Sequence, residues 1–179
     1  MLASREWRTV LHFLESNPTA PSLDGEGEDP RAFFTVDDGN LLSATGQPNV
    51  SGLSAAVAAL RKQKGIDGNP LNLSARRLVV PADYEITARQ VLKDAELRDM
   101  TVISTPEIQG AYYVMSDPGR YASLGLGYLA PPGGRLQTWS IERVSRLPST
   151  FADGAGYHVH QTMQPMLISR RGIVRCPIE

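Results

Sequence analysis

Three cations and two glycines stand close together in the stretch RKQKGIDGNPLNL, residues 61–73. Arg61, Lys62 and Lys64 lead directly to Gly65, and Gly68 follows three positions later. A glycine-rich loop whose amides face an anion, with lysines beside it, is the construction of many phosphate sites. The stretch therefore suggests a nucleotide cradle, and the elements on either side of it decide whether that chemistry is available.

The order of the neighbouring elements argues against a phosphate cradle. Leu53, Val57 and Leu60 share one helical face, which predicts a helix capped by Ser51 or Ser54 that ends at the lysines. A phosphate loop runs from a strand to a helix N-terminus and closes on Lys-[Ser/Thr], whereas this stretch runs from a helix C-terminus to a strand. The partial negative charge of that helix end attracts the lysines themselves. We predict a helix stop, with Gly65 at positive φ.

A second set of chemically capable residues is His158 and His160, which alternate along a predicted strand. Their spacing points both imidazoles to one face and can seed a metal site. His12 belongs to a distant helix, so no third ligand stands nearby, and an ordinary polar strand face is favoured over zinc or iron. A small α+β enzyme or a ligand- or metal-binding domain around His158 and His160 is the alternative to a structural protein.

Other catalytic and metal motifs do not match. The acidic stretch LDGEGEDP, residues 23–30, lacks the spacing and the closing Glu of a calcium loop. No G-x-S-x-G elbow occurs, although a triad assembled from distant segments stays open. The motifs therefore give no specific support for an enzyme or for a bound metal.

Composition limits the remaining classes of function. The 179 residues are 41% hydrophobic and carry a formal net charge of -1, so the chain can bury a core but has no overall cationic field for nucleic acid. Cys176 is the single cysteine, which excludes an internal disulfide and favours a reducing cytoplasm. The longest apolar run, residues 53–60, is too short for a membrane helix, and charged residues interrupt the N-terminal apolar pattern where a secretory signal would be continuous.

The chain predicts an α+β fold in which a sheet is flanked by helices. Residues 2–15 have the apolar spacing of an amphipathic helix, and residues 17–30 have the composition of a solvated loop. Strands are expected at 32–36, 76–81, 100–105 and 111–117, helices at about 51–64 and 82–97, and mainly extended chain in the last third.

The order of these pieces resembles a known family. The stretches FLESNP, FFTVDDGNL and GLSAAVAALRKQKGIDGNPLNLSARRLVVPADYEITARQVL resemble the major capsid proteins of tailed phages, specifically the Mu-like major head subunit group. The resemblance is most specific over residues 52–92. The later stretches YYVMSDP and FADGAGYHVHQTMQPMLISRRGI resemble the closing strands of that family more loosely.

The resemblance implies a Hong Kong 97-type capsid fold, with an axial-domain sheet flanked by helices and part of the peripheral domain. Residues 1–16 would be the end of the spine helix in the peripheral domain. Residues 17–150 would be mainly the axial domain, with an acidic loop at 17–31, and residues 151–179 would be the closing strands. The N-terminal arm and the extended loop of the family are expected to be absent, and HVHQTMQPM departs from the family's tail pattern.

As a function, the resemblance implies a structural subunit of a phage or prophage head, which would not be an enzyme and would have no catalytic residue, no cofactor, no bound metal and no small-molecule substrate. It would assemble with copies of itself or with a full-length capsid homologue, in an icosahedral virion, after synthesis in the host cytoplasm. Contact with packaged DNA would be nonspecific, through scattered Arg and Lys. A capsid-like protein repurposed as a compartment shell, or as a factor acting on another virus's assembly, fits equally. Arg61, Lys62, Lys64 and Asp67 are expected to form an exposed turn that contacts other subunits or is simply solvated.

Overall fold

The computed structural model describes residues 2–20, 30–43, 46–128, 140–144, 156–160 and 163–178. The chain divides into two compact units. Unit 1 comprises Met1–Gly125 and Leu167–Glu179, and unit 2 comprises Leu126–Met166. Among the described residues no helix has the length and apolar character needed to cross a membrane.

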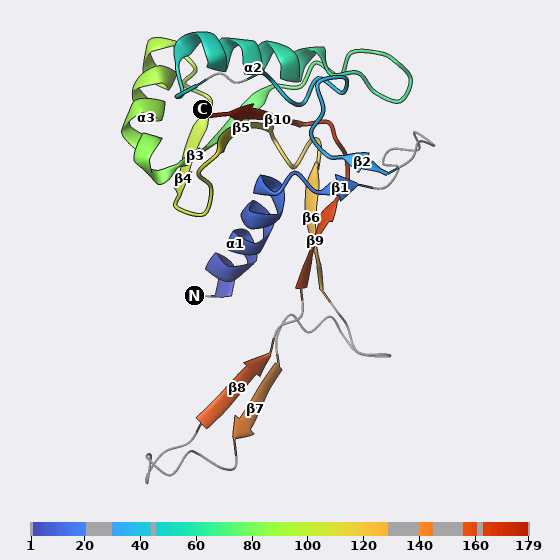
Figure 1. The fold of residues 1–179 in the computed structure, drawn as a ribbon, viewed down its shortest axis with the longest axis vertical. Helices are drawn as coiled ribbons and strands as arrows, with labels where there is room; N and C mark the ends of the chain where they lie inside the picture. Colours follow the sequence, from blue (N-terminus) through green and yellow to red (C-terminus); the bar gives the residue numbers. More distant parts are fainter. Residues whose placement is uncertain are drawn as a thin grey trace. The chain divides into compact units, whose positions relative to one another are not determined.

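Unit 1 is built around a four-stranded mixed sheet in the order β10-β5-β3-β4 (Figure 1). Its strands are β3 (Ala75–Pro81), β4 (Thr101–Thr105), β5 (Ala111–Ser116) and β10 (Ile173–Pro177). β3 and β4 are parallel, because α3 (Glu85–Asp94) between them carries the chain back to the end of the sheet at which β3 begins. β5 is antiparallel to both β3 and β10. All six residues of β5 are buried, as expected for an inner strand covered on both faces.

Two helices cover one face of this sheet. α2 (Val50–Lys62) packs over β5 and β10, and α3 (Glu85–Asp94), which follows the 3₁₀ turn η1 (Ala82–Tyr84), packs over β3 and β4. Alternate strand residues point toward these helices, since side chains on a strand have a period of two. The resulting core includes Leu53, Leu60, Leu78, Val80, Val91, Leu92, Tyr112, Val114, Val174 and Cys176.

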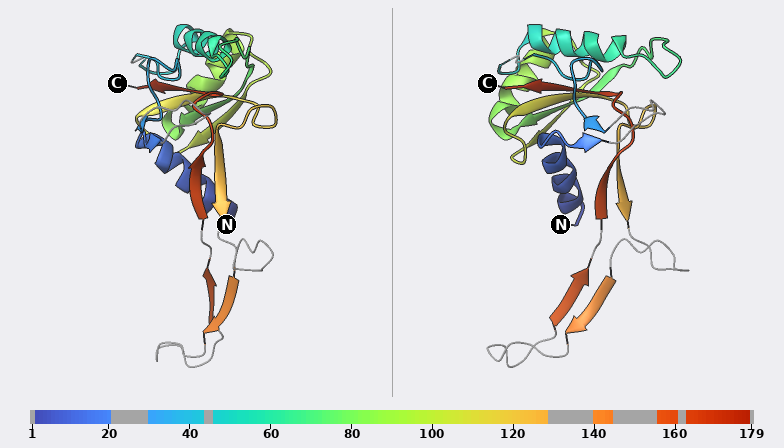
Figure 2. Two further views of the ribbon diagram at one scale, coloured as in Figure 1. Left: turned by 90° about the vertical axis from the view of Figure 1, so that its right-hand side faces the viewer. Right: turned by 45° about the vertical axis from the view of Figure 1, so that its right-hand side comes forward.

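The helix α1 (Leu2–Glu15) lies on the opposite face of the sheet from α2 and α3 (Figure 2). Its buried Leu11 and Leu14 join two phenylalanines, Phe33 and Phe34, in a second apolar layer. The Phe34 and Tyr113 ring centroids are 5.7 Å apart, which places Phe34 against the face of β5 that points away from α2. The sheet is therefore packed on both sides.

Short strands β1 (Thr19–Ala20) and β2 (Arg31–Ala32) pair beside this layer, and β2 is shorter than the strand predicted over residues 32–36. Phe33 and Phe34 are buried but leave the strand. The Asn17 side chain bonds both backbone groups of Phe34, at 2.8 and 3.3 Å, and the Asn40 amide donates to the Phe33 carbonyl at 2.8 Å. Side-chain amides thus satisfy the polar backbone that a neighbouring strand would otherwise pair with.

The solvated loop predicted over residues 17–30 is wrong at its start, since β1 lies there and Ala20 is fully buried, and residues 21–29 lie outside the described part of the chain. The other predicted helices and strands of unit 1 match closely, apart from two details of α2. Its N-cap is Asn49, whose Oδ1 accepts a 2.7 Å hydrogen bond from the Gly52 amide, and neither Ser51 nor Ser54 is the cap. At its other end Gln63 is already extended, with φ -56° and ψ 137°. Gly65 does not adopt positive φ, and Gly68 does, at φ +76°. The helix therefore ends without a residue in the left-handed conformation. The positive φ that favours glycine occurs three residues after Gly65, at Gly68 in the turn.

Unit 2 consists, in its described part, of two-stranded pairings. β6 (Leu124–Tyr128), which begins in unit 1, pairs with β9 (Met163–Leu167). β7 (Ser140–Val144) and β8 (Gly156–His160) are antiparallel. Because strands far apart in sequence are paired in nested order, the chain leaves unit 1 on β6 and returns to it on β9.

Candidate functional site

The four residues predicted as a contact surface lie at one end of α2. Arg61 and Lys62 form its last turn, Lys64 follows the helix, and Asp67 lies in the turn beyond. All four are exposed. These residues therefore form one exposed segment at the C-terminal end of α2. They do not lie at a helix N-terminus, where a phosphate-binding loop would be.

The turn itself is held by its own polar groups. The Gly65 amide donates to the Asn69 carbonyl at 2.8 Å, and the Gly68 amide donates to the Gly65 carbonyl at 3.0 Å. The Asp67 carboxylate accepts from the Asn69 backbone amide at 3.1 Å and from its side-chain amide at 2.7 Å. These hydrogen bonds, the side-chain one first, lower the pKa of Asp67. The turn is thus an ordered projection, and Ile66 at its tip is 74% exposed.

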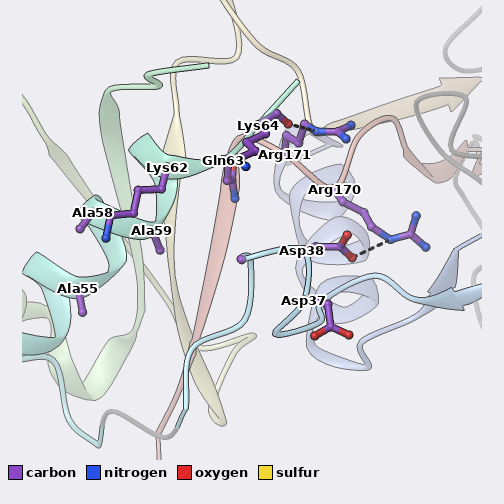
Figure 3. Close-up of a pocket in the computed structure, with 11 residues that line it drawn as sticks. Asp37, Asp38, Ala55, Ala58, Ala59, Lys62, Gln63, Lys64, Arg170 and Arg171 are labelled. Carbon is purple, nitrogen blue, oxygen red and sulfur yellow. Dashed lines mark hydrogen bonds and ion pairs between the residues drawn. The ribbon is translucent and has the colours of Figure 1, made fainter. Parts of the chain in front are cut away.

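Gln63 fastens the start of this turn to the C-terminal part of unit 1. Its buried side chain donates to the Ile173 carbonyl at 3.2 Å and accepts from the Gly172 amide at 2.7 Å. Arg171 adds a hydrogen bond from its Nε to the Lys64 carbonyl (Figure 3). The position of the turn therefore depends on residues more than one hundred positions away in the sequence.

A groove of about 670 Å³ lies between α2 and the segment containing Asp37 and Asp38 (Figure 3). One wall is α2, where Ala55, Ala58 and Ala59 present only methyl groups to the groove. Charged groups form the rest of the lining. The lining comprises Asp37, Asp38, Gly39, Ala55, Ala58, Ala59, Lys62, Gln63, Lys64, Arg170 and Arg171.

Arg170 anchors the wall opposite α2. It is only 2% exposed, and its Nε lies 3.7 Å from the Asp38 carboxylate. Its Nη2 donates to the carbonyls of Ala20 and Arg31, at 3.4 and 3.3 Å. Asp38 also pairs with Arg31 at 2.9 Å and accepts a 2.6 Å hydrogen bond from the Thr35 hydroxyl. A buried charge is tolerated when it is paired and hydrogen-bonded in this way.

Sequence reasoning missed Gln63, Arg170 and Arg171 as residues that shape this region. No spacing rule connects residues 63 and 64 with 170 and 171, because only the pairing of β10 with β5 brings the last segment beside α2. The signal that was available is the pair Arg170-Arg171 directly before Gly172, where φ is +83°. A double arginine at a tight turn indicates side chains directed to opposite sides of the chain.

The alternative site around His158 and His160 is only partly described. Both residues belong to β8, with His158 opposite Glu142 and His160 opposite Ser140, so the predicted strand is confirmed. Their side chains lie outside the described part of the structure. Among the residues that are described, no group of three His, Cys, Asp or Glu side chains is placed to hold a metal ion.

Comparison with known families decides the class of protein. The sequence model of a family described as phage capsid protein matches residues 4–176, which is nearly the whole chain. The chain belongs to this family. A search of curated proteins found no match. The chain is therefore a phage capsid protein, a structural subunit of a phage head, in a family whose role is structural and not catalytic.

Because the chain is a phage capsid protein, its exposed surfaces are candidates for contacts with other capsid subunits. A head subunit assembles with other capsid subunits in the virion, so it must present surfaces that are complementary to its neighbours. The mixed α+β architecture of unit 1 is consistent with a phage capsid domain. The projecting turn after α2 and the groove beside it are the described features that we consider for such contacts.

Proposed function

We propose that the chain is a head subunit of the Mu-like group with a Hong Kong 97-type fold, in which residues 17–150 are mainly the axial domain. The sheet of unit 1 with α2 and α3 on one face agrees with an axial domain. α1 would be the end of the spine helix of the peripheral domain, and residues 151–179 would be the closing strands. The subunit would be located in the host cytoplasm before assembly. Its contact with packaged DNA would be nonspecific.

The observation that carries a contact role is the ordered turn after α2. The turn exposes an isoleucine, Ile66, close in sequence to the charged residues Arg61, Lys62, Lys64 and Asp67. A large apolar side chain on a rigid projection stabilises an interface well, because little conformational freedom is lost when it is covered. The charged neighbours then select the partner surface. This turn is the proposed subunit contact.

Unit 2 provides a second proposed contact. An isolated two-stranded hairpin is marginally stable in water, and β7 with β8 is a two-stranded pairing. A ribbon of this kind gains stability when it lies on a neighbouring subunit. The pair β7 and β8 would then hold neighbouring subunits together, a role that the family's extended loop would have at another place in the sequence.

The test of the turn is assembly of the purified chain, alone and mixed with a full-length capsid homologue, followed by size-exclusion chromatography and negative-stain microscopy. Wild-type chain should form rings, shells or mixed particles. Ile66→Ser should lower the assembled fraction by at least about tenfold, the effect of losing roughly 1.4 kcal/mol at an interface. Ile86→Ser, which changes an isoleucine on α3 that is even more exposed, is the matched control and should assemble normally.

Two results would count against the contact. A wild-type chain that stays monomeric under all conditions, including with the homologue, would remove the role in assembly. Equal loss for Ile66→Ser and Ile86→Ser would show that exposed apolar area in general, and not this turn, drives association.

A further inference from the structure

The groove beside α2 has an unusual distribution of charge and size. Lys62 and Lys64 bring two positive charges to its α2 side. Asp38 already lies between Arg31 and Arg170, so Asp37 is the remaining carboxylate of the lining. Setting the two arginines and Asp38 aside, two lysines face one carboxylate. The groove therefore favours an acidic occupant.

The alanine wall indicates what kind of acidic occupant fits. Ala55, Ala58 and Ala59 form a shallow apolar surface one methyl group deep, which suits a polypeptide backbone lying close to the helix. The side chain of Lys62 extends along this wall beside Ala58 (Figure 3). A single-stranded nucleic acid suits the groove less well, because the residues that line it include no aromatic side chain on which a base could stack.

The sequence contains one segment with matching features. Residues 24–29 read Asp-Gly-Glu-Gly-Glu-Asp, with four carboxylates and no cation. In an extended chain, Asp24, Glu26 and Glu28 would point to one side and the intervening glycines to the other. The glycine side has no Cβ and can approach a wall of alanines closely, while the acidic side meets the lysines.

We propose that this groove binds the acidic segment 24–29 of a second copy of the chain. The inference deepens the proposed subunit contact and rests on it, since Lys62 and Lys64 belong to both. Asp37 sets the direction of the bound segment, because it repels carboxylates from its end of the groove. The contact is electrostatic, so salt weakens it.

A synthetic peptide tests the groove without requiring shells. Fluorescently labelled peptide 21–30 is titrated into the full chain, and its anisotropy is measured at low and high salt. Lys62→Gln with Lys64→Gln should weaken binding about tenfold, whereas Lys93→Gln with Arg98→Gln, two exposed cations elsewhere in unit 1, should not. A peptide with Asn and Gln in place of its four acids should bind no better than the double variant does.

A charge exchange between copies tests the contact in the assembly. One variant carries Lys62→Glu and Lys64→Glu, and the other carries Glu26→Lys and Glu28→Lys. Each should assemble poorly alone, because the first variant has a negative groove facing a negative segment and the second has a positive groove facing a segment that has lost its net negative charge. A mixture of the two should recover assembly, since the positive groove of the second variant can bind the acidic segment of the first. Recovery in the mixture distinguishes contact between copies from contact within one chain.

The proposal fails if the acidic and neutral peptides bind equally, or if both double Gln variants weaken binding to the same extent. It also fails if a short DNA duplex displaces the peptide while the charge-reversed variants assemble normally, since the groove would then be a general polyanion site. Recovery only when all four reversals are placed in one chain would overturn contact between copies. A monomeric wild-type chain that still binds the peptide would count against assembly and not against the groove.

Discussion

Arg170 shows how a single residue holds distant parts of unit 1 together. Its guanidinium is buried and reaches Asp38 and two backbone carbonyls on separate segments, those of Ala20 and Arg31. Lysine would not replace it, because a compact ammonium cannot reach several acceptors in the fixed geometry of a guanidinium. The residue therefore determines the shape of the groove wall opposite α2.

Arg170→Met should lower the free energy of unfolding by about 2–3 kcal/mol, because it removes a buried charged donor from the Ala20 and Arg31 carbonyls and one of the two cations beside Asp38. Chemical denaturation followed by circular dichroism measures the change. Arg76→Met removes an exposed ion pair, 3.3 Å from Asp99, and should cost less than about 1 kcal/mol. Similar losses for the two variants would contradict the role given to Arg170.

Cys176 offers a second prediction at the residue scale. Burial raises the pKa of its thiol from 9.0 to about 12, so the thiolate fraction near neutral pH is about a thousandfold lower than in an ordinary cysteine. Maleimide should therefore label the native chain very slowly and label the chain in denaturant at a normal rate. Fast labelling of the native chain would contradict the buried position of this strand.

The same shift of the Cys176 pKa gives a pH dependence of stability. Between pH 9 and 12 the unfolded chain loses the thiol proton while the folded chain keeps it, so the free energy of unfolding should fall as pH rises through this range. Below pH 9 the contribution is complete. Burial likewise raises the pKa of Tyr113 from 10.0 to about 12, so Cys176→Ala should reduce the alkaline loss without abolishing it.

At the scale of elements, α2 positions both the turn and one wall of the groove, and its start depends on Asn49. Asn49→Ala removes the acceptor for the Gly52 amide and should cost about 1 kcal/mol. Thermal unfolding measures this loss. Ser51→Ala, which changes the neighbouring exposed serine, should leave the melting temperature nearly unchanged. A larger effect at Ser51 would restore the cap expected from sequence.

Local patterns predicted most elements of unit 1, because period and composition report which face of a segment is buried. β3, β5 and α2 follow from runs such as Arg76–Pro81 and from the spacing of Leu53, Val57 and Leu60. The segment after β2 was mispredicted, because Asn17 and Asn40 replace the backbone partners of a strand. A side chain that caps a distant backbone leaves no periodic pattern.

One part of the candidate site could be predicted from the sequence and another part could not. The exposed turn with Lys64 and Asp67 could be predicted, because charges and glycines at a helix end have a local physical meaning. The groove could not, since it forms only when residues 170–171 lie beside α2 through the order of strands in the sheet. Strand order depends on long-range packing, and a single sequence carries little information about it.

At the scale of the whole molecule, unit 2 leaves and re-enters unit 1 on paired strands. The Ile168 and Ser169 amides both donate to the Ser123 carbonyl, at 3.0 and 3.2 Å, so the two crossing points are adjacent. Replacing residues 127–165 with a short Gly-Ser linker should leave unit 1 folded, with a melting temperature within a few degrees of wild type. The same variant should lose assembly if unit 2 is a subunit contact.

Hydrogen exchange of unit 1 amides checks the first part of this prediction, and negative-stain microscopy checks the second. Protection should persist in β3 and β5, whose residues belong to the core cluster described for unit 1. Collapse of that protection would show that the core needs unit 2. Normal shells from the shortened chain would remove unit 2 from the list of contacts.

The adjacency of the two crossing points also affects how such a chain can evolve. Insertions, deletions or exchanges between positions 126 and 166 begin and end at neighbouring strands, so they do not have to alter the residues packed beneath α2 and α3. Recombination between related phages can therefore replace this segment as a module. Lineages should diverge fastest there, while the sheet-bearing unit changes slowly.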